Sequence, residues 1–102
     1  MIGIDRMTDP AQIHRAILRA TRQGDFAIAE IQRVTQRSET LRRESDTITA
    51  KPLRDITPAD VERIIQITRE VERLLARNRR AQAMLTAATE RLKQIQKEHT
   101  HG

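Results

Sequence analysis

The side chains with the clearest capacity for chemistry are three histidines, His14, His99 and His101. His99 and His101 are one residue apart and could share a metal ion, but no cysteine and no His–Glu cluster at ligand spacing accompanies them. A protein metal site normally needs about three or four ligands. The chain also lacks a glycine-rich phosphate loop, and its acidic residues are scattered over polar positions. We therefore expect no enzyme, no metal site and no cofactor.

Arginines form the most basic surface that the sequence predicts, because no acidic residue occurs between Arg73 and Glu90. The arginines that fall on one flank of a helix are Arg69, Arg73, Arg77, Arg80 and Arg91. Such a stripe could bind an anionic partner, either nucleic acid or an acidic protein. No aromatic residues for base stacking are interleaved with it. The pattern is more typical of a solvated face whose arginine stems cover the edge of an apolar seam.

Two long heptad patterns must position these side chains. Small and aliphatic residues recur at alternating spacings of three and four, which places them on one seam of an α-helix. The first seam is Ile13, Ile17, Ala20, Gly24, Ala27, Ile31, Val34, Ser38, Leu41, Ser45 and Ile48. The second seam is Ile64, Ile67, Val71, Leu74, Asn78, Ala81, Leu85, Ala88, Leu92 and Ile95. Each seam must be buried against another helix, so the sequence predicts function through helix contacts.

Turn and cap residues set the expected boundaries. Asp9-Pro10 and Thr57-Pro58 each place a capping side chain before a proline at the first helical position. We expect helices over about 10–47 and 58–97, a connector over 48–57 that contains Pro52, a frayed lead-in over 1–8 and a disordered tail over 98–102. The heptad phase passes through Gly24 without a slip, which favours one continuous helix with a bend over two separate helices.

Composition agrees with a single elongated helical domain. The chain has 102 residues, no cysteine, a net charge of +5 and Phe26 as its one aromatic residue, so aliphatic side chains and alanine must build the core. No segment reaches the roughly 20 consecutive apolar residues needed to cross a membrane, and no signal peptide is recognisable at the start. We expect a soluble cytoplasmic protein without a membrane span.

The fold class that follows is all-α, an antiparallel and coiled-coil-like hairpin of two long helices. Apolar residues beside the seams, such as Ile28, Val61, Ile65, Leu75 and Met84, widen the stripe beyond what two helices cover. We therefore expect dimerisation or a partner helix to complete the structure. The amide of Asn78 on the second seam could fix the register or contact that partner.

Two segments resemble the FlgN-type flagellar export chaperones. These are Arg22-Gln-Gly24-Asp25-Phe26-Ala-Ile28-Ala-Glu30-Ile31 and Leu74-Leu75-Ala-Arg77-Asn78-Arg-Arg-Ala81-Gln82-Ala-Met84-Leu85, followed by Arg91-Leu92-Lys-Gln-Ile95. The resemblance implies a small helical protein that holds amphipathic terminal helices of hook–filament junction subunits and delivers them to a type III export gate. It also implies an apolar groove for that cargo. The groove residues would be Leu74, Leu75, Asn78, Met84, Leu85, Ala88, Leu92 and Ile95.

Two other functions fit the same pattern. A structural coiled-coil or scaffold subunit would form a stable homo-oligomer without an exposed groove. A basic helical nucleic-acid-binding protein would use the arginine stripe, and its binding would weaken steeply as salt is added. Because no nucleic-acid-binding motif accompanies the stripe, we expect a protein partner and no nucleic acid.

Overall fold

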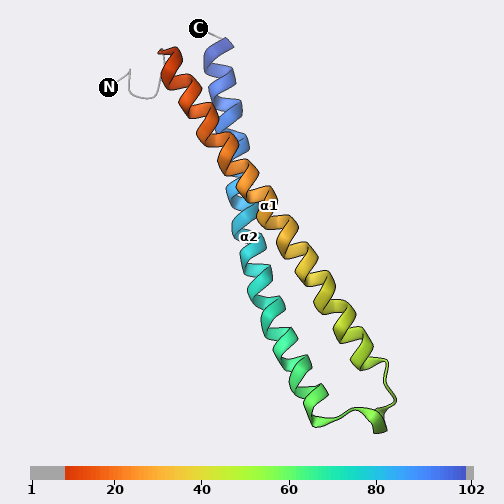
Figure 1. Cartoon of the computed structure of the whole chain (residues 1–102). Coiled ribbons are helices and arrows are strands. Elements are labelled where there is room, and N and C mark those ends of the chain that lie inside the picture. The colour runs from red at the N-terminus through yellow and green to blue at the C-terminus, as the bar shows by residue number, and fades with distance from the viewer. Residues whose placement is uncertain (1–8, 101–102) are drawn as a thin grey trace. The chain divides into compact units, whose positions relative to one another are not determined.

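The computed structural model describes residues 9–100, with side chains through residue 98. Helix α1 (Pro10–Thr49) is joined to helix α2 (Pro58–Thr100) by a connector that contains the short 3-10 helix η1 (Leu53–Asp55) (Figure 1). The two long helices run antiparallel, so the predicted all-α hairpin is confirmed.

Both long helices begin at the capping residues that the sequence predicts. The Asp9 carboxylate accepts a hydrogen bond from the backbone N–H of Ala11 at 3.0 Å. Thr57 and Asp60 cap each other reciprocally, since the Thr57 hydroxyl accepts from the Asp60 N–H and the Asp60 carboxylate accepts from the Thr57 N–H, each at 3.1 Å. The Thr57 N–H and then Lys51, whose Nζ lies 2.9 Å from the carboxylate, lower the pKa of Asp60.

The helices extend somewhat further than predicted. Helix α1 continues through Gly24 without a break and ends at Thr49, where 47 was expected. Helix α2 reaches Thr100 rather than 97, because no glycine or proline interrupts the helical pattern before Gly102. The expected lead-in over 1–8 and the last two residues of the expected tail lie outside the described residues.

The chain divides into two compact units. Unit 1 comprises Met1–Ala29 and Ala81–Gly102, and unit 2 comprises Glu30–Arg80. In both units, one of the two seam positions in each heptad is fully buried. The buried positions recur every seven residues, at Ala20, Ala27, Val34, Leu41 and Ile48 on α1 and at Ile67, Leu74, Ala81, Ala88 and Ile95 on α2. This repeat is the pattern expected of coiled-coil packing.

The core of unit 2 is built from branched aliphatic side chains. Val34 and Leu41 from α1 cluster with Ile67 and Leu74 from α2, and Val71 packs against them. Leu41 is completely shielded from solvent. Burial of these branched side chains is expected to be a main source of the stability of unit 2.

The core of unit 1 is built mainly from small residues, together with Ile95. Ala20 and Ala27 on α1 and Ala81 and Ala88 on α2 are all buried. At Gly24, the position of an added Cβ would lie 3.8 Å from the Cβ of Ala88. Alanine and glycine at the seam let the helix backbones approach closely, so unit 1 buries less aliphatic volume than unit 2.

Candidate functional site

One edge of unit 2 is closed by arginine–glutamate pairs between the helices. In the described part of unit 2, the ion pairs that join α1 to α2 are Arg37–Glu70, Arg63–Glu44 and Arg77–Glu30. We call these six residues the ion-pair edge. From one pair to the next, the residue on α1 advances by seven and the residue on α2 goes back by seven. An antiparallel heptad register requires this spacing.

The pairs have the geometry of strong charge-assisted hydrogen bonds. The Nε and Nη2 atoms of Arg37 lie 2.6 Å and 3.1 Å from the two carboxylate oxygens of Glu70. Arg63 binds Glu44 in the same bidentate way, with its Nη2 donating at 2.8 Å. Because both nitrogens are held, these pairs fix the relative register of the two helix segments in unit 2.

The same hydrogen bonds shift the titration of the acids. A hydrogen bond from the partner arginine is the largest cause that lowers the pKa of Glu30, Glu44 and Glu70 below its usual value, and the arginine charges add to it. Conversely, the hydrogen bond to Glu70 raises the pKa of Arg37. The carboxylates of Glu30, Glu44 and Glu70 are therefore charged at neutral pH.

The opposite flank of α2 in unit 2 carries aliphatic side chains without interhelical ion pairs among the described residues. Val61, Ile65 and Leu75 are exposed there, Val61 at 51% and Leu75 at 52%. With about 3.6 residues per turn, they share one face on the far side of the buried seam from the ion-pair edge. We call these three residues the open edge.

Two threonines beside the seams, Thr68 and Thr49, add few free hydrogen-bond donors to this side of unit 2. The Thr68 hydroxyl donates to the backbone carbonyl of Ile64 at 2.9 Å, and the Thr49 hydroxyl donates to that of Ser45 at 3.0 Å. Because each hydroxyl hydrogen is used by the threonine's own helix, the methyl groups remain for contact with another molecule. The open edge of unit 2 can therefore accept an apolar partner without leaving unpaired donors.

The eight groove residues that the resemblance implies occupy three different environments. Leu74, Ala88 and Ile95 are buried within their own units. Asn78, Leu85 and Leu92 are half-buried. Leu75 and Met84 are exposed. With the helices packed as they are, the exposed members can meet a partner directly, and the buried members would have to leave their own core.

The predicted arginine stripe is likewise divided. Arg77 is engaged by Glu30 on the ion-pair edge, and Arg91 is half-buried with a long hydrogen bond of 3.4 Å to Gln94. Arg69, Arg73, Arg77 and Arg80 are exposed, and of these four only Arg77 is in an ion pair with a described residue. Arg73 also contributes to the low pKa of Glu70. Part of the positive charge is thus used within the hairpin itself.

Sequence reasoning missed the ion-pair edge, although its signal was present. The positions just before one seam residue of each heptad read Glu30, Arg37, Glu44 on α1 and Arg63, Glu70, Arg77 on α2. These alternate in sign and become complementary once the helices are antiparallel.

The described residues contain no group of three or more His, Cys, Asp or Glu side chains that could hold a metal ion. The side chains of His99 and His101 lie outside the described residues. Among the described residues, no helix is long and apolar enough to cross a bilayer. Comparisons with known protein families, curated proteins and solved structures found no match to this chain.

Proposed function

We propose that this chain is a protein-binding hairpin that receives an amphipathic helix of another protein along the open edge. The observation that carries the proposal is the asymmetry of unit 2. One flank of its buried seam is closed by charged pairs, and the other exposes Val61, Ile65 and Leu75. Thr68 and Glu72 lie between Ile65 and Leu75 on the same face. Exposed aliphatic side chains grouped on one helix face are typical of interaction sites.

The dimensions of the open edge suit a helix. Val61 and Leu75 are 14 residues apart on α2, which corresponds to about 21 Å of helix axis. A partner helix of about four turns would cover this length, with apolar residues at spacings of three and four facing the edge. Such a partner would complete a three-helix arrangement around the existing seam.

The resemblance to the FlgN-type chaperones suggests what the partner would be. In that case the hairpin holds the amphipathic terminal helices of flagellar export substrates until secretion, and it does so by contact alone. The open edge supports this role because it is apolar, exposed and free of interhelical ion pairs in the described chain.

Light scattering of the chain, alone and with synthetic peptides of hook–filament junction terminal helices, tests the proposal. We expect a complex of one hairpin with one peptide, and we expect the double variant Val61→Ser, Leu75→Ser to weaken binding by about tenfold or more. Leu53→Ser is the matched control, because Leu53 is 87% exposed and belongs to η1 rather than to the open edge on α2.

Two results would overturn this function. A folded monomer that binds none of the peptides has no cargo role. A stable homodimer that is indifferent to the peptides but is weakened by Val61→Ser, Leu75→Ser would identify the chain as a scaffold subunit, whose open edge is covered by a second copy.

A further inference from the structure

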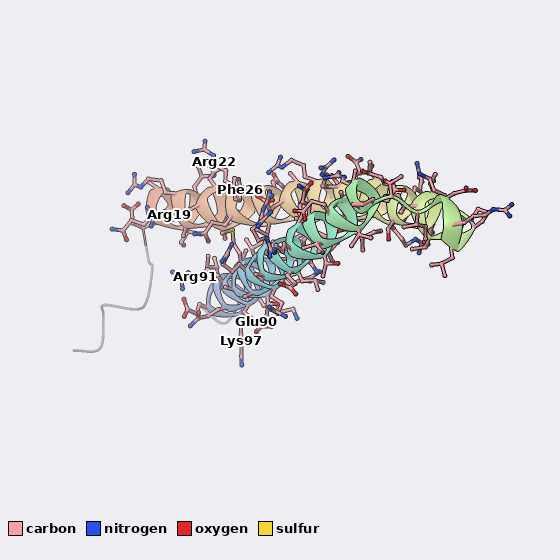
Figure 2. The ribbon with its side chains drawn as sticks, turned by 90° about the horizontal axis from the view of Figure 1, so that it is seen from below. Arg19, Arg22, Phe26, Glu90, Arg91 and Lys97 are labelled. Carbon is pink, nitrogen blue, oxygen red and sulfur yellow. The ribbon has the colours of Figure 1, made fainter. Side chains whose placement is uncertain are left out.

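Unit 1 exposes the only aromatic side chain of the protein on a basic face. Phe26 is 55% exposed on α1. Arg22 and Arg19 precede it by one and two turns on α1 (Figure 2). Neither arginine forms an ion pair with a described residue. The single acid of α1 in this unit, Asp25, lies on another side of the helix. A large apolar ring is thus framed by two uncompensated guanidinium groups.

The same flank of unit 1 has an arginine on α2 that lacks an acidic counterpart on α1. The close approach of Gly24 to Ala88 sets the helix register within unit 1. Along α2, Arg91 takes the same heptad position as Arg63 and Arg77, but it forms no ion pair with a described residue, whereas those two arginines pair with Glu44 and Glu30. Among the described residues, Arg91 makes only a long hydrogen bond to Gln94 on its own helix, at 3.4 Å.

Exposed sulfur and methylene groups extend this surface. Met84 is exposed and lies two helical turns before Arg91 on α2. The two residues therefore take the same heptad position. Methionine adapts its shape readily to a partner surface. Glu90 lies on a different side of α2 from Arg91 (Figure 2), and it pairs with Lys93 at 3.8 Å.

We propose that Arg19, Arg22, Phe26, Met84 and Arg91 of unit 1 form a second docking surface, which binds an acidic amphipathic helix of a protein partner. Carboxylates of the partner would meet the three arginines, as the glutamates of unit 2 already meet theirs. An apolar partner residue would cover Phe26 and Met84. None of these five residues belongs to the open edge, so the inference is independent of the proposed function.

A protein helix fits this surface better than the other anionic partners. Nucleic acid bound without sequence preference favours several aromatic side chains for stacking, and Phe26 is the only one available. Membrane-surface helices present a broad apolar face beside their basic residues, whereas here arginines flank the ring on its own face. Arginine and exposed aromatic residues are, by contrast, the usual anchors of protein interfaces.

A displayed library of helical peptides with randomised surface positions provides the test. Peptides selected on the full-length chain should be enriched in Asp and Glu around a large apolar residue. Their affinity, measured by fluorescence anisotropy, should fall by about tenfold or more in Phe26→Ala and in Arg19→Glu, Arg22→Glu. It should also fall as salt is added, because these exposed charges are screened.

Matched controls separate local charge from global charge. Arg54→Glu, Arg79→Glu makes the same charge change at exposed positions of unit 2 that form no ion pair with described residues. Leu53→Ala removes a comparable exposed apolar side chain. Neither control should change peptide affinity by more than about twofold. Circular dichroism should show that every variant folds, since all altered side chains are exposed.

Several outcomes would overturn the inference. Selected peptides without acidic enrichment, or affinity unchanged in Phe26→Ala and in Arg19→Glu, Arg22→Glu, would show that this surface is not the site. Binding to phosphatidylserine vesicles or to duplex DNA that requires Phe26, with no acidic helix selected, would assign the surface to a membrane or to nucleic acid. Loss of binding in Val61→Ser, Leu75→Ser alone would place the selected peptides on the open edge instead.

Discussion

Replacing Gly24 by alanine should stabilise the hairpin, although the glycine lies on the seam. Gly24 is in the interior of α1, where the helix is continuous and its backbone has no positive φ angle. The conformation is therefore one that alanine adopts without strain. Any stability change should come from the added methyl group and from the lower entropy of the unfolded chain.

The expected magnitude follows from helix propensity and from the space at the site. Alanine is favoured over glycine in a helix interior by about 1 kcal/mol. The new Cβ would stand 3.8 Å from the Cβ of Ala88 and 4.0 Å from the Cδ1 of Leu85, which is ordinary van der Waals contact. The variant should unfold at a temperature about 4–8 °C higher, as about 1 kcal/mol does in a domain of this size.

Thermal and urea unfolding followed by circular dichroism, at one fixed protein concentration, measures this change. Gly24→Leu provides the contrast, because atoms beyond Cβ would meet Ala88 and Leu85 and should lower stability. Ala87→Gly, at an exposed position of α2 in the same unit, gives the propensity effect alone, about 1 kcal/mol of destabilisation.

A destabilised Gly24→Ala protein would refute this reasoning. It would mean that the helices approach more closely at Gly24 than 3.8 Å allows, or that α1 must deviate there from a regular helix. In either case the glycine would serve function or assembly rather than the packing seen within unit 1.

Three further perturbations test the core and the ion-pair edge. Leu41→Ala should cost about 2–5 kcal/mol in urea unfolding, because the side chain is fully buried; a loss below about 1 kcal/mol would contradict the packing of unit 2. Arg37→Glu should destabilise the chain, because it places a second negative charge beside Glu70. Adding Glu70→Arg should restore the free energy of unfolding. A double variant no more stable than Arg37→Glu alone would show that the pair does not form in solution. Glu30, Glu44 and Glu70 have a lower pKa in the folded chain than the usual 4.5, so the unfolded chain takes up protons first as the pH falls, and the free energy of unfolding should decline below about pH 4.5. An unfolding free energy that stays flat through this pH range would remove the ion-pair edge as a source of stability.

Capping residues and heptad periodicity predicted much of the fold from the sequence. The caps at Asp9 and Thr57 predicted both helix starts, and the heptad phase predicted a helix unbroken at Gly24. The helix ends were less accurate, since α1 ends at Thr49 and α2 at Thr100 rather than at 47 and 97. Start signals are specific side chain to backbone hydrogen bonds, whereas these ends lack a glycine or proline stop and depend on fraying.

The candidate surfaces were harder to predict. A heptad seam in the sequence identifies apolar residues, but it does not say which of them remain exposed to solvent once the helices pack. Leu74, Leu75 and Met84 look alike in the sequence, yet Leu74 is buried while Leu75 and Met84 are exposed. The difference arises because two antiparallel helices cover one seam position in each heptad fully and leave the neighbouring positions at the margin.

The sequence by itself determined that this protein is a pair of capped helices with heptad seams, since propensity, capping and periodicity act within one helix at a time. Only the tertiary structure decided which flank of unit 2 is closed by Arg–Glu pairs and which is left open. It also left the side chain of Phe26 in unit 1 more than half exposed. Arg91 in the same unit forms a hydrogen bond to Gln94 but no ion pair with a described residue. The physical reason is that charge pairing and burial depend on the register between segments far apart in the chain, and that register exists only once the helices pack.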